Sequence, residues 1–250
     1  MPSRCFLPIV IATLCCSGCE DINAPVVGRY RATIEVSGHE LPFFIDVARE
    51  NERFVLILPN AGERLRIGDV QVDGRALHAR LPSNSTLSVT ASRSHLRGTL
   101  TIKDKRGASH TLPLEAELGE PHLFYDEALS DNADVEGRWD VMLQTNSGDR
   151  TNAVALLDQQ YDRIVGTLVL DSGQQHALHG QVHDEELQLA SLSWSDARLF
   201  KLKLTSRGAL EGDAWQLSGV RHSVKATRNS ESSLDATQAR AVEQRSRSST

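Results

Sequence analysis

The sequence is poor in cysteine, and every cysteine lies near its beginning. The four are Cys5, Cys15, Cys16 and Cys19, so residues 20–250 contain none. Disulfides therefore cannot stabilise that part of the chain. A dithiol redox centre is excluded there as well, because thiol-disulfide exchange needs an accessible thiolate and a resolving partner.

The sequence also lacks a positively charged face. It carries 27 Lys and Arg against 33 Asp and Glu, a formal net charge of −6. Its densest basic group, Lys103 to Arg106, has the composition of a charged hairpin turn. Nucleic-acid binding needs a basic surface, so we expect no nucleic-acid partner. The 250 residues suffice for one or two domains, and the 40% hydrophobic content is ordinary for a globular protein.

No apolar run is long enough to span a bilayer. The run Phe6 to Leu14 follows Arg4 and precedes the letters CCSGC, an arrangement typical of an export signal. The end of this segment resembles the lipobox of bacterial lipoproteins, with Ser17 and Gly18 before an acceptor Cys19. Cys16 stands where that family usually has Leu. The alternative is an ordinary secretory signal, but no Ala-x-Ala cleavage site is visible.

The lipoprotein resemblance implies a signal peptide at residues 1–18 and an acylated Cys19 that holds the protein in a bacterial cell envelope, facing the periplasm. Loss of Arg4 would leave 26 basic and 33 acidic residues, a formal charge of 26 − 33 = −7. An acidic body is not attracted to anionic lipid. We therefore expect the acyl chains to supply the membrane contact.

Alternation of apolar and polar residues runs through the rest of the chain and predicts an all-β protein. In the first half we expect eight strands, at residues 28–37, 40–49, 53–58, 63–73, 75–81, 86–91, 96–103 and 109–118. In the second half we expect another eight, at residues 137–145, 150–158, 163–171, 174–182, 186–192, 198–205, 209–215 and 221–227.

The two halves resemble one another. VVGRY begins at Val26 and VEGRW at Val135, which places Gly28 and Gly137 at equivalent positions 109 residues apart. LRGTL at Leu96 and LEGDA at Leu210 also correspond, at an offset of 114. These matches predict tandem modules at residues 26–118 and 135–228.

Each module is predicted to be an antiparallel meander. Eight strands joined by short turns close most simply into an up-and-down barrel, because closure removes the sheet edges. A β-sandwich is the alternative. The opening Gly-x-Trp resembles lipocalin- and avidin-type (calycin-like) barrels, in which the aromatic plugs one end. The resemblance implies that Tyr30 and Trp139 are such plugs.

Two segments fall outside the modules. Residues 119–134 form an acidic linker, in which we expect Phe124 and Tyr125 to dock on a barrel. Residues 229–250 are rich in Ser, Arg and Gln and poor in large apolar residues, so we expect a disordered or weakly helical tail.

The second module is expected to have a filled interior. In the strand RLFKLKL, Phe200, Leu202 and Leu204 should point inward, because burial of Lys201 and Lys203 would cost several kcal/mol. The strand at 151–158 is apolar on both faces. We therefore expect at most a small apolar pocket inside the barrel, and packing of the two barrels through the outer face of residues 151–158.

Metal-binding and catalytic motifs are scarce. His179 and His183 would share one face of a strand but lie ~13 Å apart at ~3.3 Å per residue, and His176 would point the other way. Zinc ligands converge to about 2 Å. The chain has no Gly-x-Ser-x-Gly and no Gly-rich phosphate loop. We expect no metal, cofactor or catalytic residue.

The stretch from Glu186 to Asn229, with VEGRWDV and the tandem layout, resembles the β-rich N-terminal region of TlpA-like periplasmic oxidoreductases of the thioredoxin family. The resemblance covers about residues 26–228, and this chain has no thioredoxin domain and no Trp-Cys-x-x-Cys. Of the family's loop residues only His222 is retained, while Trp194 and Asp196 occupy the other loop. Redox activity is therefore not carried over, and Trp194, Asp196 and His222 remain a candidate ligand or partner surface.

Three functional hypotheses follow. The first is a non-enzymatic, lipid-anchored envelope protein that acts as a binding or interaction module. The second is a carrier of a small apolar ligand inside one barrel. The third is an accessory subunit of a separately encoded thioredoxin-like oxidoreductase.

Overall fold

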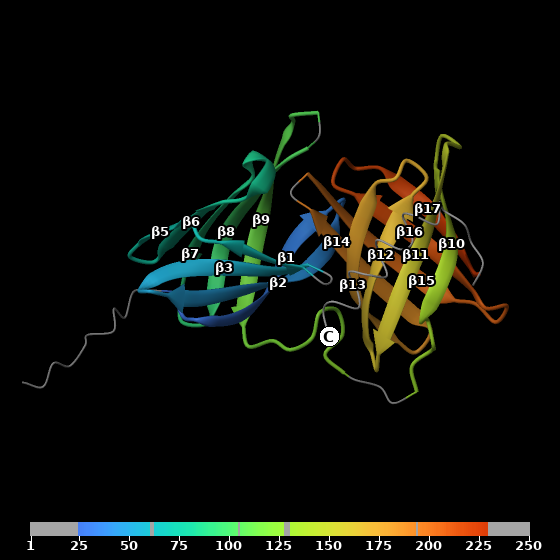
Figure 1. Cartoon of the computed structure of the whole chain (residues 1–250), viewed down its shortest axis with the longest axis horizontal. Coiled ribbons are helices and arrows are strands. Elements are labelled where there is room, and N and C mark those ends of the chain that lie inside the picture. Colours follow the sequence, from blue (N-terminus) through green and yellow to red (C-terminus); the bar gives the residue numbers. More distant parts are fainter. Residues whose placement is uncertain (1–24, 61–62, 105, 128–130, 194, 230–250) are drawn as a thin grey trace, which may run out of the picture.

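The computed structural model describes residues 25–60, 63–104, 106–127, 131–193 and 195–229. Within these ranges the chain forms seventeen strands and one short 3₁₀ turn, so the protein is all-β, as predicted. The strands make two antiparallel sheets that lie side by side (Figure 1). No helix in the described ranges is long and apolar enough to cross a membrane.

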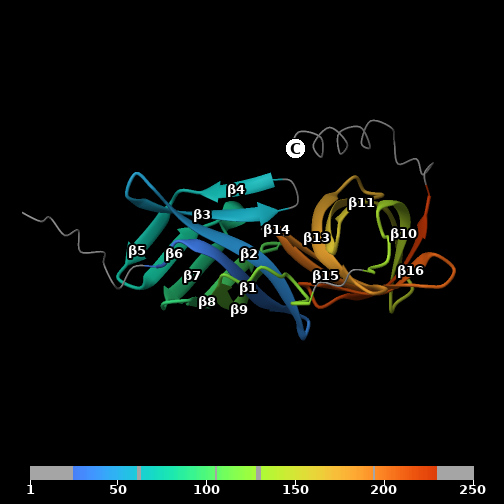
Figure 2. The ribbon, with the colours of Figure 1, turned by 90° about the horizontal axis from the view of Figure 1, so that it is seen from below.

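The first module is a nine-stranded sheet curled into a nearly closed barrel (Figure 2). The strand order is β4-β3-β2-β1-β9-β8-β7-β6-β5. The bounds are β1 (Gly28–Val36), β2 (His39–Glu50), β3 (Arg53–Asn60), β4 (Glu63–Ile67), β5 (Val70–Asp73), β6 (Ala76–Arg80), η1 (Pro82–Asn84), β7 (Thr86–Ala91), β8 (His95–Lys103) and β9 (Ser109–Leu118).

The first barrel does not close, and its opening lies at residues 63–73, where one continuous strand was expected. The predicted strand at 63–73 is divided at Gly68 and Asp69 into β4 and β5. Gly and Asp are both poor strand formers, and the interruption leaves these two strands as the unpaired edges of the sheet. The module therefore has nine strands instead of eight, and β3 lies near β5 across the opening.

The second module is a closed eight-stranded barrel, as predicted. Each strand pairs antiparallel with the next, and β10 pairs with β17 to close the ring (Figure 2). The bounds are β10 (Gly137–Thr145), β11 (Arg150–Gln160), β12 (Arg163–Leu170), β13 (Gln175–His183), β14 (Glu186–Ser193), β15 (Asp196–Leu204), β16 (Ala209–Gln216) and β17 (Arg221–Arg228).

The repeated Gly-Arg-aromatic opening has the same structure in both modules. Tyr30 is 0% exposed and donates its hydroxyl proton to the Val26 carbonyl at 2.8 Å. Trp139 is 1% exposed, and its Nε1 donates to the Val135 carbonyl at 3.0 Å. Each aromatic thus bonds to the carbonyl four residues before it. This confirms both aromatics as core residues and shows that the two modules begin with the same local structure.

The apolar core of the first module includes side chains from the second module. These side chains do not come from the strand that was expected to join the two modules. Ala190 and Leu192 on β14, with Ala197 and Leu199 on β15, point out of the second barrel and are buried in the core of the first. The prediction that residues 151–158 form this contact is therefore wrong. The sequence around β14 and β15 is also apolar on both faces, and the contacts from β1 and β2 fall there.

Polar and aromatic contacts accompany this interface. The rings of His39 and Trp215 lie 4.0 Å apart, centroid to centroid. Ser37 donates its hydroxyl proton to the Gln216 carbonyl at 3.1 Å. The β1–β2 hairpin of the first module therefore lies against the end of β16.

His179 lies at the same interface, and it is only partly exposed. It lies on the outward face of β13 and close to Pro42 of β2. Both ring nitrogens are buried, and no well-formed hydrogen bond reaches either one within the described part of the chain. Loss of water lowers the pKa of His179 to about 4, and the nearby Pro42 carbonyl only partly opposes this shift. The imidazole is therefore neutral at pH 7.

One side chain of β13, Gln181, binds three consecutive backbone N–H groups of the linker and helps to dock it on the second barrel. The Gln181 Oε1 atom accepts from the backbone N–H groups of Leu123, Phe124 and Tyr125 at 3.0, 2.6 and 3.0 Å. Its Nε2 atom donates to Asp162 Oδ2 at 2.8 Å. Phe124 packs on the first core, so both aromatics of the linker dock as predicted.

We predict that Gln181→Ala lowers the free energy of unfolding by about 1–3 kcal/mol, because three backbone N–H groups lose their acceptor. The matched control is Gln175→Ala, an exposed glutamine on the same strand, which should leave stability within about 0.5 kcal/mol of the wild type. Urea unfolding of both variants measures the difference. Equal effects of the two substitutions would contradict the role assigned to Gln181.

Candidate functional site

Apolar side chains fill the central part of the second barrel's interior. Phe200 and Leu202 point inward, and Lys201 and Lys203 lie exposed outside, as predicted. The remaining cavity has a volume of about 20 Å³, room for a single water at most. It is lined by Trp139, Val141, Ala155, Leu157, Leu168, Leu178, Leu189, Phe200, Leu202, Leu210, Val224 and Ala226. The expectation of a small apolar pocket is confirmed.

The two ends of this barrel differ in chemistry. Trp139 closes the end at which β10 begins, and the Arg228 guanidinium lies 5.0 Å from its ring centroid. At the other end, β14 and β16 finish while β13, β15 and β17 begin. The alternation that points Leu189, Phe200 and Val224 inward continues there into polar residues. We call this the polar end, and it comprises His176, Ser191, Asp196, Arg198, Gln216 and His222.

A fixed guanidinium lies at the centre of the polar end. Arg198 Nε donates to Asp196 Oδ2 at 2.8 Å, and the two side chains are only 11% and 18% exposed. The amide orientation of Gln216 that satisfies its hydrogen bonds lets its oxygen accept from both Nη atoms, at 3.0 and 3.1 Å. Asp196 therefore neutralises the charge of Arg198. Asp196 and Gln216 together fix the orientation of the planar guanidinium group.

His222 lies next to this pair. It is buried on the inward face of β17. Burial lowers the pKa of His222, the positive charge of Arg198 lowers it further, and Asp196 acts in the opposite direction. At pH 7 the imidazole is neutral, with one donor and one acceptor nitrogen. The cluster therefore combines donors and acceptors with almost no net charge.

The structure brings together two of the predicted surface residues. Asp196 and His222 both interact with Arg198, although they are 26 residues apart in the sequence. Trp194 and Cys19 lie outside the described residues. Sequence reasoning missed Arg198 and Gln216. The sequence contained one indication of this site. Arg198 is a charged residue at a position that the alternation of β15 points inward, with Phe200 and Leu202.

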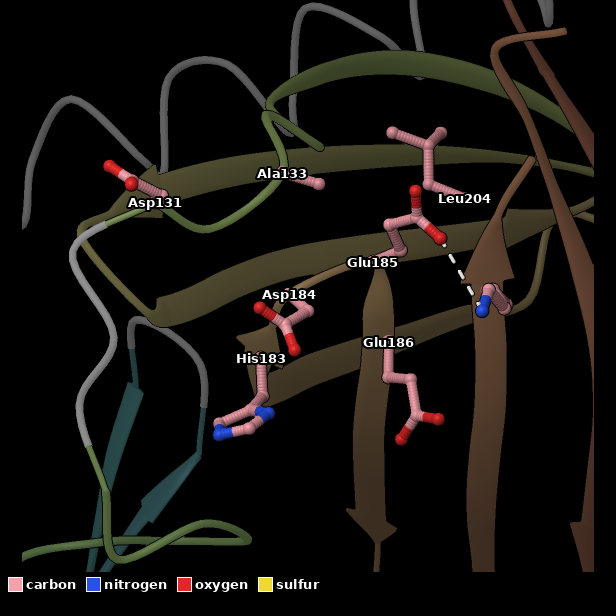
Figure 3. A pocket seen from close by; sticks show the side chains of 8 residues that line it. Asp131, Ala133, His183, Asp184, Glu185, Glu186 and Leu204 are labelled. Atoms are coloured by element: carbon pink, nitrogen blue, oxygen red, sulfur yellow. Dashed lines mark ion pairs between the residues drawn. The ribbon is translucent and has the colours of Figure 1, made fainter. Parts of the chain in front are cut away.

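An acidic hollow lies near the plugged end. Its volume is about 720 Å³, and Lys203 pairs with Glu185 there at 3.3 Å (Figure 3). The carboxylates are spread over the wall and do not converge (Figure 3). In the described ranges no group of three or more His, Cys, Asp or Glu is arranged to hold a metal. The hollow is lined by Asp131, Ala133, His183, Asp184, Glu185, Glu186, Lys203 and Leu204.

The three closely spaced histidines have separate surroundings. His176 points into the barrel at the polar end, and His179 faces the first module. His183 stacks on Tyr125 of the linker with ring centroids 4.7 Å apart. They do not form one site.

The sequence matches no known family and resembles no curated protein. Among solved structures, a protein of unknown function from the DUF3598 family of Nostoc punctiforme aligns with 81% of this chain and 96% of its own length. The identity is 10% and the TM-score is 0.27. A likeness at this level supports no statement about function.

We predict that His222 titrates below the ordinary histidine pKa of about 6.5 and that Arg198→Gln raises its pKa, because a neighbouring positive charge is lost. Lys201→Gln, an exposed residue on the same strand, is the control and should leave the pKa unchanged. NMR titration of the imidazole resonances measures all three proteins. A His222 pKa that does not respond to Arg198→Gln would contradict the geometry described for the polar end.

Proposed function

We propose that the protein is a non-enzymatic binding or interaction protein, held in a bacterial cell envelope by an acylated Cys19, which recognises a partner with the polar end of its second barrel. The observation that carries the proposal is the gathering of Asp196, Arg198, Gln216 and His222 at the end opposite the plug. A buried ion pair is weak evidence for a role in stability. Recognition is a better reason for its presence.

The polar end is organised before a partner arrives. Arg198 is bonded to Asp196 and Gln216, and Ser193 donates its hydroxyl proton to the Asp196 carbonyl at 3.0 Å. Groups that are already fixed lose little conformational entropy on binding. With donors, acceptors and almost no net charge, the cluster suits a polar peptide segment of another envelope protein. A separately encoded thioredoxin-like oxidoreductase is the first partner to test, because of the sequence resemblance.

The carrier hypothesis receives less support. An eight-stranded barrel has room for interior side chains or for one small ligand. In the second barrel the side chains leave a cavity of about 20 Å³, and drug-sized ligands need pockets of about 300 Å³ or more. We therefore place recognition on the surface of the second barrel and not inside it.

For the anchor, we predict that Cys19→Ala moves the protein from the membrane fraction to the soluble fraction, because an acidic body has no other attraction to lipid. Cys16→Leu, which improves the lipobox and keeps the acceptor, should remain in the membrane fraction. Fractionation followed by mass spectrometry of the mature N-terminus is the measurement. An unmodified N-terminus at another residue would refute the anchor.

For the recognition surface, we predict a difference between photocrosslinkers placed at opposite ends of the barrel. A photoreactive residue at Ser218, in the exposed turn after β16, should give a defined adduct in the envelope. One at Tyr161, which is exposed at the plugged end, should not. The Ser218 adduct should disappear when Arg198→Gln and His222→Ala are added. An adduct that forms only from Tyr161 would move recognition to the other end and refute the proposal.

A further inference from the structure

The orientation of the Gln216 side chain depends on contacts outside the second barrel. Gln216 pairs with Arg198 across β15 and β16, and its amide oxygen accepts from both Nη atoms of Arg198. Trp215 and Leu217, the residues before and after Gln216, pack against the core of the first module. Because successive side chains of an extended chain point to opposite faces, this packing directs Gln216 toward the inside of the barrel and the polar end.

The hairpin turn between β1 and β2 of the first module reaches the same place. This turn consists of Ser37 and Gly38, which both have positive φ, at 53° and 81°. The Ser37 hydroxyl donates to the backbone carbonyl of Gln216 at 3.1 Å. The ring of His39, the first residue of β2, lies 4.0 Å from the ring of Trp215, centroid to centroid. The first module therefore contacts the backbone of Gln216 and the side chain that precedes it.

Ser37 is an unusual residue for such a turn. Two-residue turns with positive φ at both positions favour Asn, Asp or Gly at the first, and a positive φ costs conformational free energy in residues other than glycine. In the corresponding turn of the second barrel, between β10 and β11, the Ser147 hydroxyl donates to Asp149 of the same turn at 2.7 Å. The Ser37 hydroxyl instead bonds to the other module, and this contact gives a reason for serine at the position.

We propose that the first module is a positioning element of the polar end, in which Ser37 and His39 fix Gln216 and Gln216 orients the guanidinium of Arg198. A guanidinium can rotate about its Nε–Cζ bond while the Nε bond to Asp196 stays intact. An acceptor that binds both Nη atoms, as Gln216 does, restrains this rotation. The two modules then act as one recognition unit. The positioning rests on the contacts alone, and only its effect on recognition rests on the function proposed above.

NMR measurement of the exchange between the two Nη groups of Arg198 tests the positioning in the full chain. Ser37→Gly removes the hydroxyl and suits the positive φ, so the turn remains folded. His39→Ala removes the ring. Each variant should speed the rotation about threefold, and the double variant about tenfold, because one or two contacts of ordinary strength are lost. Gln216→Ala should speed it at least as much as the double variant does.

Two control variants separate positioning from a general loosening of the first module. Asn51→Gly changes another positive-φ residue, with φ 47°, in the exposed turn at the other end of β2. His39→Phe keeps an aromatic ring against Trp215. Both should leave the rotation of Arg198 unchanged. Equal acceleration by Asn51→Gly and Ser37→Gly would overturn the proposal, and so would a rotation rate that Gln216→Ala or the double variant leaves as in the wild type.

Recognition is measured separately with the photoreactive residue at Ser218. The double variant Ser37→Gly, His39→Ala should lower the adduct yield about threefold or more, because Arg198 is no longer fixed before binding. A yield that falls in Gln216→Ala but not in the double variant would contradict the part of the first module in recognition. If the wild type gives no adduct, the proposed function fails, and the rotation rates alone decide whether the hairpin positions Arg198.

Discussion

Near the polar end, β14 and β15 are buried on both faces, and the arrangement of the two modules depends on this double burial. Their inward residues fill the second barrel, while Ala190, Leu192, Ala197 and Leu199 enter the core of the first. The hydrophobic effect therefore acts across the module boundary as well as within each module. A shared core of this kind fixes the relative position of the two barrels, which two separate cores on a linker would not do.

Other features follow from that fixed position. It brings the β1–β2 hairpin against the end of β16, where Ser37 bonds to the carbonyl of Gln216. The Gln216 side chain in turn accepts from Arg198. The first module thus supports the residue that orients the guanidinium of the polar end. The two modules differ accordingly: both have a buried aromatic residue hydrogen-bonded to the carbonyl four residues before it, whereas only the second has a closed wall.

Much of the fold could be predicted from the sequence, because alternation and turn residues are local signals. The strand positions, the buried plugs at Tyr30 and Trp139 and the inward direction of Phe200 all follow from such signals. The contact between modules could not be predicted in this way. Residues 151–158 and 187–199 both have two apolar faces, and only the tertiary structure decides which of them meets the other module. The break at Gly68 was visible in composition, but the apolar residues on either side of it favoured a continuous strand.

The candidate site was predictable only in part. Asp196 and His222 drew attention through a family resemblance, but spacing gives no reason for residues 26 positions apart to meet. Closure of the barrel brings them together, since β15 and β17 both begin at the polar end. Arg198 was missed, although the alternation that points Phe200 and Leu202 inward also points Arg198 inward.

The neutral ring of His179 makes the joint between the barrels sensitive to acid. In the unfolded chain this histidine takes up a proton near pH 6.5, but in the folded protein it does so only near pH 4. The contribution of His179 to the free energy of unfolding is therefore fully present above pH 6.5. It falls by about 1.4 kcal/mol for each pH unit between pH 6.5 and pH 4, on the order of 3 kcal/mol in all. Below pH 4 this loss no longer grows. Because the ring lies between the modules, this loss falls on the contact between the two barrels.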